Sequence, residues 1–281
     1  MKTIESVLDL LDLKSLGLDR FEGSQPGDGS KRVFGGQAAA QALMAACTTV
    51  EDRLPHSLHV YFVSAGDTQL PIEFGVDRVR DGRRYSTRTV TASQQGRVIL
   101  TGMVSFGEST DGDCYHDDPG VVVSQPEALQ PIERQLAAYV DEYDGWWTRD
   151  RPFDLRYTTP PPRVALDVPD APDPSSSVWL RANGSLTVDE VTSRCLVTYV
   201  SDMTLLDSAA KMTRQTSRGP GTIASLDHAV WFHRTPDLSQ WHLYEQHSPV
   251  RSSGRSLVRG RIVDTNWNPV CTVTQEGLLE P

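Results

Sequence analysis

One aspartate of this chain stands where a carboxylate could do chemistry. Asp202 follows Ser201 at a point where a helical pattern breaks and restarts, so we expect it near the N-terminus of a helix. The free backbone N–H groups at such an end favour developing negative charge. A carboxylate held there can take a proton from a water molecule as the water attacks a substrate. A plain helix N-cap would show the same pattern, so both interpretations stay open at this point.

The histidines and cysteines do not have the spacing of a metal site. His228 and His233 are five residues apart, as are His242 and His247. Both pairs lie in strand-like runs, where this offset points the side chains to opposite faces. The four cysteines are separated by at least 67 residues and form no CxxC pair. Since GxSxG, GxxxxGK[ST], GxGxxG and HExxH motifs are also missing, we expect neither a metal nor a cofactor.

Two further groups of side chains could bind a ligand. His228 lies close to Ser225 and could orient its hydroxyl, but a structural histidine explains it equally well. Arginines recur along one strand-like region, and guanidinium groups suit phosphates. These arginines are Arg251, Arg255, Arg259 and Arg261. A solvated strand face would show the same spacing.

Charge and composition exclude several classes of protein. The chain has 281 residues with 27 Lys and Arg against 37 Asp and Glu, a formal net charge of −10. A nucleic-acid-binding protein usually needs a concentrated basic face, so we expect no nucleic-acid partner. No apolar run approaches the ~18 residues that span a bilayer, and the first residues do not resemble a secretory signal. We therefore expect a cytoplasmic protein without membrane insertion.

The first part of the chain predicts two helices followed by strands. An amphipathic helix is expected over 4–16, and an Ala-rich helix almost without charge over 37–50. A helix so poor in charge should be buried on most sides. Four strand-like runs follow, with an Asp81-Gly82 turn signal between the second and the third. The runs are 56–64, 71–80, 84–94 and 97–106.

The second part repeats this order after a proline-rich stretch. We expect residues 1–106 to form an N-terminal unit, 107–178 an inter-domain connection with one helical segment near 131–145, and 179–281 a C-terminal unit. In the last unit a helical segment over 187–216, with a break in the Tyr199–Asp202 region, precedes four strand-like runs. These runs are 222–233, 241–250, 255–265 and 268–278.

An internal repeat connects the two units. Tyr61-Phe62 with Asp67 has the same spacing as Trp231-Phe232 with Asp237, at an offset of 170. Two further correspondences are expected: Gly82-Arg83 with Gly254-Arg255 at an offset of 172, which also pairs Met103 with Gln275, and Gln37 with Asp202 at an offset of 165. The repeat indicates an α+β fold in which two duplicated units, each a helix wrapped by a curved antiparallel sheet, join into one sheet. Two unrelated α+β domains remain the alternative.

Five blocks of sequence together resemble the acyl-CoA thioesterase II family, which has a double hotdog fold. The blocks are VFGGQAAAQAL (33–43), HSLHVYFVSAGD (56–67), SDMTLL (201–206), ASLDHAVWFHR (224–234) and VTQEG (273–277). The resemblance implies hydrolysis of fatty acyl-CoA to free fatty acid and CoA, without metal or cofactor. Implied partners are the acyl-CoA substrate and further copies of the chain in a dimer or larger homo-oligomer.

The same resemblance implies a catalytic set of Asp202, Ser225 and Gln275, with the aspartate activating a water that the other two orient. The family more often has Thr where this chain has Ser225, and Arg-Pro before the Gly-Asp that here follows Val63-Ser64-Ala65. Substrate binding is expected of His228, Arg251, Arg255 and Arg259. Because Gln37 and Met103 stand opposite Asp202 and Gln275, we expect a degenerate site in the first unit and one active site per chain.

Three alternatives remain. An enoyl-CoA hydratase or dehydratase of the same fold typically needs Asp-x4-His on the buried helix, but the residue in that place is Asp207. A non-catalytic acyl-CoA-binding protein would not be expected to keep the three residues of the catalytic set. Direct attack by Asp202 on the thioester, which gives an anhydride, stays open beside the activated-water route.

Overall fold

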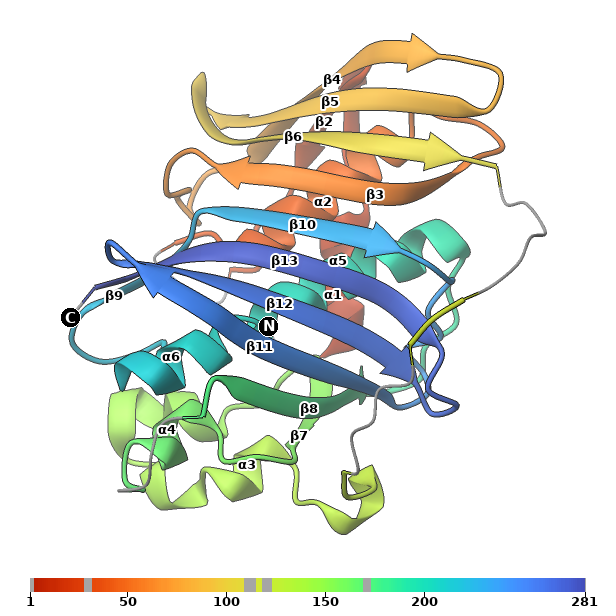
Figure 1. Cartoon of the computed structure of the whole chain (residues 1–281). Coiled ribbons are helices and arrows are strands. Elements are labelled where there is room, and N and C mark those ends of the chain that lie inside the picture. The colour runs from red at the N-terminus through yellow and green to blue at the C-terminus, as the bar shows by residue number, and fades with distance from the viewer. Residues whose placement is uncertain (1–2, 28–31, 109–114, 118–122, 169–172, 281) are drawn as a thin grey trace.

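One large antiparallel sheet organises the molecule (Figure 1). The computed structural model describes residues 3–27, 32–108, 115–117, 123–168 and 173–280. Within these ranges thirteen strands form a single sheet, and the main helices pack against one of its faces. The two duplicated units are therefore joined into one continuous sheet, as the sequence predicts.

The order of the strands is the same in the two halves when read outward from the centre. The first half runs from edge to centre as β1 (Lys14–Gly17), β2 (Arg20–Gly23), β4 (Ile72–Asp81), β5 (Tyr85–Gln94), β6 (Arg97–Gly107) and β3 (Leu54–Phe62). The second half continues from centre to edge as β10 (Asp227–Phe232), β13 (Pro269–Glu280), β12 (Arg255–Asp264), β11 (His242–Ser252), β8 (Ser175–Ala182) and β7 (Phe153–Tyr157). A short strand, β9 (Thr222–Ser225), also pairs with β13.

Two long helices form the centre of the core. The expected Ala-rich helix is α2 (Gly35–Cys47), and it packs against α5 (Glu190–Thr204) of the second half. A Cβ atom at Gly36 would lie 2.5 Å from the Tyr199 carbonyl oxygen, so glycine allows this close crossing. The remaining helices are α1 (Ile4–Leu11), α3 (Ile132–Gln135), α4 (Pro162–Ala165), α6 (Asp207–Thr213) and the 3₁₀ segments η1 (Pro126–Ala128), η2 (Ala137–Tyr139) and η3 (Glu142–Thr148).

An approximate twofold axis relates the halves. In the β3–β10 pair His59 lies opposite Ala229, which is its own counterpart at the offset of 170. Between the helices the rings of Phe34 and Tyr199, which correspond at an offset of 165, touch with centroids 5.1 Å apart. Because each residue meets its own counterpart, the axis passes through both contacts. The predicted tandem repeat is thus present in three dimensions.

Strand pairing corrects the expected offset of 172. Val90 of β5 pairs with Val76 of β4, and in the second half Gly260 of β12 pairs with Gln246 of β11. Both residues of the second pair lie 170 positions after those of the first, so β5 corresponds to β12 at an offset of 170. Strands β6 and β13 correspond at an offset of 171. Leu58 pairs with Val104 in the first half, and the β10–β13 register places His228, the counterpart of Leu58, opposite Gln275. The turns that contain Gly82 and Gly254 have equal length, because Gly82 faces Tyr85 as Ser252 faces Arg255. Gly254 therefore corresponds to Arg84 and not to Gly82.

The counterpart of Gln275 is therefore Val104 and not Met103. Met103 is 48% exposed on the outer face of the sheet, whereas Gln275 is fully buried on the inner face. A shift of one residue along a strand moves a side chain to the opposite face. The expected correspondence of Met103 with Gln275 was wrong for this reason.

Three expected boundaries also differ in the structure. The first helix ends at Leu11, and residues 14–17 form the edge strand β1. The long helical segment breaks at Leu205–Leu206 and not before Asp202, which lies in the last turn of α5. Strand β7 and the first half of β8 fall in the expected connection 107–178, yet they extend the second half of the sheet beside β11, in the places that β1 and β2 take in the first half.

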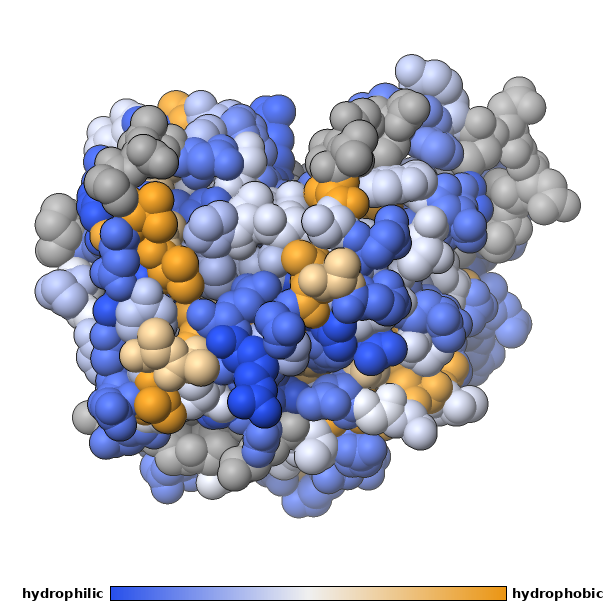
Figure 2. All heavy atoms as spheres, turned by 90° about the horizontal axis from the view of Figure 1, so that it is seen from below, coloured by the Kyte–Doolittle hydropathy of each residue, from blue (hydrophilic) through white to orange (hydrophobic). Residues whose placement is uncertain are grey.

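The side of the molecule that carries α3 and α4 is mainly hydrophilic, with apolar side chains in small separate groups (Figure 2). Among the described residues, no helix combines the length and the apolar character that a membrane crossing requires.

Candidate active site

Asp202, Ser225 and Gln275 meet on the inner side of the sheet. The Ser225 hydroxyl lies 3.2 Å from Asp202 Oδ1, to which it donates, and the Gln275 amide donates to the same oxygen at 3.0 Å. The Gln275 Nε2 group also lies 2.5 Å from Ser225 Oγ. Two side chains that are 23 and 73 residues from Asp202 in sequence thus donate to the same carboxylate oxygen.

The secondary structure explains how these residues converge. Gln275 stands on β13 with Val273 and Gly277, and the alternation of the strand turns all three to the inner face. Strand β9 pairs with the end of β13 and places Ser225 opposite Gly277. Asp202 is on the side of α5 that faces this part of the sheet, so its carboxylate reaches both strands.

A helix N-terminus does lie beside Asp202, but it belongs to the other half of the molecule. The backbone N–H of Gly36, in the first turn of α2, hydrogen-bonds to the carboxylate. A Cβ atom at Gly35 would lie 2.8 Å from Asp202 Oδ2, so a glycine permits this approach. The expectation that Asp202 begins its own helix was wrong, because α5 runs through it. The first half instead supplies the positive end of α2 to the site.

Burial raises the pKa of the Asp202 carboxyl above its ordinary value. Its side chain is only 3% exposed, and an ionised carboxylate is costly out of water. The nearby His228 and the hydrogen bonds from Gln275, Ser225 and Gly36 oppose this rise. A carboxylate with a raised pKa accepts a proton more readily than an exposed aspartate does, which suits a general base.

His228 is fully buried and contacts the amide of Gln275. Of the two interpretations that the sequence left open, orientation of the Ser225 hydroxyl is not supported by a contact between the two side chains. The Nδ1 atom of His228 lies 2.9 Å from Gln275 Oε1 and 4.0 Å from Asp202 Oδ1. On the other side of the ring, Nε2 lies 2.9 Å from Ser201 Oγ. His228 therefore connects α5 to Gln275 behind the carboxylate.

Sequence reasoning missed one polar partner of this group, Tyr244. Its hydroxyl donates to the Ser201 carbonyl oxygen at 3.0 Å, and its ring is fully buried. The only sequence signal was a tyrosine in the strand-like run 241–250, which is also typical of an ordinary core strand.

The expected phosphate-binding arginines do not come to the carboxylate. Arg255 and Arg259 alternate with buried Val258 and are exposed on the outer face of β12. Arg255 forms an ion pair with Glu276 at 3.0 Å. Arg251 is exposed at the end of β11 and donates to the Leu279 carbonyl oxygen.

Apolar side chains of both halves lie beside the site. Phe62, at the end of β3, packs near Gly35 and the carboxylate, and its backbone N–H donates to the Leu226 carbonyl oxygen at 2.9 Å. Phe34, Phe62, Ser225 and Leu226 are all half-buried, whereas Gln275 behind them is fully buried.

Other candidate sites contain none of these residues. In the part of the chain that the structure describes, no group of three or more His, Cys, Asp and Glu side chains could hold a metal ion. A surface cavity of about 550 Å³ lies between η3, α4 and the segment 214–220, and its guanidinium groups include Arg163, which is paired with Glu142 and Asp167.

Comparison with known proteins gives matches along nearly the whole chain. A family model described as acyl-CoA thioesterase matches residues 170–278, and one described as acyl-CoA thioesterase N-terminal domain matches residues 24–107. Acyl-coenzyme A thioesterase 8 of Homo sapiens is 32% identical over 97% of this chain and 88% of its own length. For acyl-CoA thioesterase 2 of Haemophilus influenzae the identity is also 32%, over 98% of this chain and 97% of the relative.

A solved structure shows the same architecture. The crystal structure of the acyl-CoA thioesterase II TesB2 from Mycobacterium marinum superposes with a TM-score of 0.79 and 35% identity, over 99% of both chains.

Proposed function

The chain belongs to the acyl-CoA thioesterase family and is a thioester hydrolase, and on this basis we propose that it hydrolyses fatty acyl-CoA with Asp202 as the general base. The observation that carries the residue assignment is the convergence of Ser225 and Gln275 on Asp202 Oδ1. Each of these contacts is within hydrogen-bonding distance, and the three side chains come from three separate elements.

The proposed reaction needs little acid catalysis. A water molecule held at Asp202 attacks the thioester carbonyl carbon while the carboxylate takes one of its protons. The bond from carbon to sulfur then breaks, and the CoA thiolate leaves with the proton returned from Asp202. Ser225 and Gln275 fix the direction of the carboxylate and the water, which replaces random encounters by one orientation. The N-terminus of α2 favours the negative charge that develops beside it.

Isotope labelling distinguishes this route from an anhydride. In repeated turnover in H₂¹⁸O, the activated-water route puts ¹⁸O into the free fatty acid and leaves Asp202 unlabelled. Attack by the carboxylate on the thioester would transfer ¹⁸O into Asp202 when water opens the anhydride at the aspartyl carbon. Mass spectrometry of the peptide that contains Asp202 reads the difference, and label in that peptide would contradict the general-base role.

Release of CoA thiol tests the activity itself. A panel of short- to long-chain acyl-CoAs with a thiol-reactive dye should show release with at least some chain lengths. A hydratase would change the acyl chain without releasing thiol, and a non-catalytic binding protein would bind acyl-CoA without turnover. Residues 190–213, which include both helices of the second half, contain no histidine that could serve a hydratase.

The outer face of the sheet supports a homo-oligomer as part of the same proposal. Around the β3–β10 junction Tyr61 is 64% exposed and Met103 48%, and the rings of His59 and Trp231 are in edge contact there. Exposed apolar groups on a sheet face are typical of protein contacts. Light scattering after size-exclusion chromatography measures the mass in solution, and a monomer at all concentrations would contradict this part.

A further inference from the structure

The hydrogen bonds around His228 determine where its proton must be. Gln275 donates through Nε2 to both Asp202 and Ser225, so its Oε1 atom is the one that faces the imidazole. An amide oxygen has no proton to donate. The Nδ1 atom of His228 must therefore carry the hydrogen of the 2.9 Å contact. The single Ser201 hydroxyl proton has two possible acceptors, Nε2 of His228 and the Thr198 carbonyl oxygen at 3.1 Å. Ser201 donates to Nε2 when the ring is neutral, or donates to Thr198 and accepts from Nε2 when the ring is charged.

This contact controls which end of the Gln275 amide faces the carboxylate. With the amide turned over, Oε1 would face Asp202 Oδ1, and two acceptors would meet at about 3 Å without a proton between them. The imidazole N–H stabilises the opposite orientation from behind. Because His228 is fully buried and held at its other nitrogen by Ser201, the ring itself has little freedom.

The first half of the chain gives independent support. Leu58 occupies the place of His228 and pairs with Val104, which occupies the place of Gln275. Both residues are buried, at 1% and 0% exposure. The same fold thus accepts an apolar pair in the half that has Gln37 in the place of Asp202. The imidazole of His228 is therefore not needed to form the sheet.

From these observations we infer that His228 is a positioning residue for the hydrolysis. Its Nδ1–H group holds the Gln275 amide so that Nε2 points at Asp202 and Ser225, and it makes no contact with the substrate. The inference rests on the function proposed above, since Gln275 is the residue through which His228 acts.

Two substitutions separate the N–H group from the shape of the ring. His228→Leu introduces the first-half residue and leaves Gln275 Oε1 without a donor. We expect it to lower kcat on the order of 10²-fold, the size of effect that a small misplacement of a reacting group produces, with KM nearly unchanged. His228→Asn can place an amide N–H near the position of Nδ1 and should recover most of the lost rate. The control His233→Leu changes an exposed histidine at the end of the same strand and should leave kcat unchanged.

A double-mutant cycle tests whether His228 acts through Gln275. Gln275→Val alone should reduce kcat by about 10- to 10³-fold, because it removes an orienting donor. The double variant His228→Leu with Gln275→Val should be no slower than Gln275→Val. Effects that multiply, or an unchanged kcat in His228→Leu, would overturn the inference.

The position of the proton can be measured without any variant or assay. In the ¹⁵N-histidine-labelled protein, the His228 resonance should show a protonated Nδ1 in slow exchange with water. An unprotonated Nδ1 would overturn the inference even if thioester hydrolysis is confirmed. Conversely, a protonated Nδ1 in a protein that releases no CoA thiol would place the failure in the proposed function and not in the hydrogen-bond assignment.

Discussion

The two halves of the molecule share their strand order and register but differ at four equivalent positions on the inner face. In the second half these positions carry hydrogen-bonding side chains that meet at one carboxylate, and in the first half they carry one amide and three apolar residues. The pairs, second half first, are Asp202 and Gln37, Ser225 and Pro55, His228 and Leu58, and Gln275 and Val104. All four hydrogen-bonding side chains are thus present in the second half, and only one of the four positions is polar in the first.

This contrast shows why a site that keeps only some of these polar side chains is disfavoured. A buried donor or acceptor that loses its partner costs about 1–3 kcal/mol, whereas replacing both partners by apolar groups can be nearly neutral. Without an aspartate at the position of Asp202, a buried glutamine and histidine at the positions of Gln275 and His228 would have no carboxylate to hydrogen-bond or orient. Leu58 and Val104 solve the same packing problem without hydrogen bonds.

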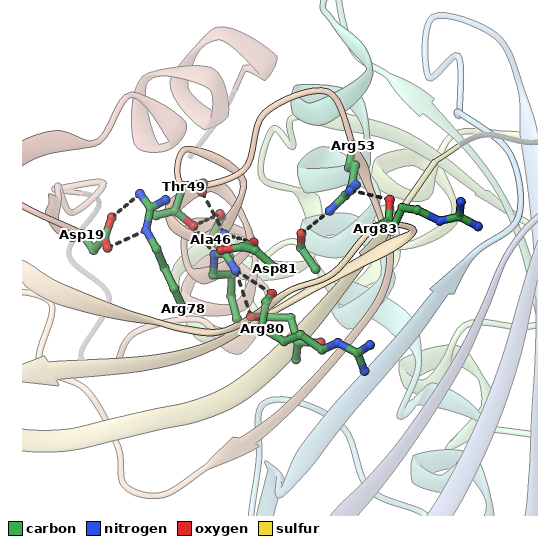
Figure 3. A network of polar contacts seen from close by, with 11 residues as sticks. Asp19, Ala46, Thr49, Arg53, Arg78, Arg80, Asp81 and Arg83 are labelled. Atoms are coloured by element: carbon green, nitrogen blue, oxygen red, sulfur yellow. Dashed lines mark hydrogen bonds and ion pairs between the residues drawn. The ribbon is translucent and has the colours of Figure 1, made fainter.

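The first half keeps a buried charge elsewhere. Val258 of the second half corresponds to Arg88, which is 1% exposed and donates to the side chain and the carbonyl oxygen of Thr49 after the end of α2. Its guanidinium also pairs with Asp81 at 2.7 Å, in a polar network at the hairpin of β4 and β5 (Figure 3). This network stabilises the C-terminal end of α2. The opposite end of that helix faces Asp202, so both halves take part in the site.

The largest test of the comparison is Asp202→Asn, which removes the base and keeps the shape. We expect kcat to fall by about 10²–10⁴-fold, the usual contribution of a positioned base. The stability of the folded variant should instead increase at neutral pH. Because burial raises the pKa of Asp202, its ionised form is disfavoured in the folded state, and the stability that the protonated form provides is lost as pH rises through the folded pKa.

At neutral pH the asparagine variant should therefore unfold at a higher temperature than the wild type. Differential scanning calorimetry and the thiol-release assay give the two readouts. Near wild-type turnover in this variant would end the assignment of Asp202 as the base.

A pH profile sharpens the same point. The base must be ionised, so kcat/KM should rise about tenfold per pH unit at the acidic end and level off above the pKa of Asp202. The midpoint should lie above the value of an ordinary aspartate, since burial raises it. Rates between pH 4 and 8 measure the profile, with circular dichroism as a control for folding. A plateau that extends down to the ordinary aspartate pKa would contradict a buried base.

Converting the second half toward the first should affect stability less than it affects activity. His228→Leu and Gln275→Val each leave one buried polar group without a partner, and each should cost about 1–3 kcal/mol of unfolding free energy. The double variant restores an apolar pair like Leu58 and Val104 and should be more stable than either single variant. Urea unfolding curves provide the cycle. A double variant less stable than both would show that the two halves do not pack alike at this position.

The sequence predicted the helices and strands better than the residue correspondence between the two halves and the contacts between distant segments. The alternating strands, the charge-poor helix and the pairing of Asp67 with Asp237 are local patterns, and all are present: both aspartates accept a backbone N–H two residues later, at 2.9 and 3.1 Å. The counterpart of Gln275 was missed by one residue because the expected offset was taken from Gly82 and Gly254, which are not structurally equivalent, and only strand pairing reveals this. The helix N-terminus beside Asp202 was assigned to the wrong half, since a contact between Gly36 and residue 202 is purely tertiary.

The smallest expected effect concerns Ser225, whose hydroxyl both accepts from Gln275 and donates to Asp202. Ser225→Thr keeps the hydroxyl and adds a methyl group that restricts χ1, so kcat should stay within about threefold of the wild type, a free-energy difference at the low end of what one hydrogen bond contributes. Ser225→Ala removes both contacts and leaves the Gln275 amide with one acceptor, and it should be clearly slower than the threonine variant. The comparison of these two variants isolates the hydroxyl, because Pro55 shows that the first half places a residue without any donor at this point of the fold. Equal rates for the alanine and threonine variants would mean that the hydroxyl has no role and that Gln275 and the Gly36 N–H suffice to orient the carboxylate.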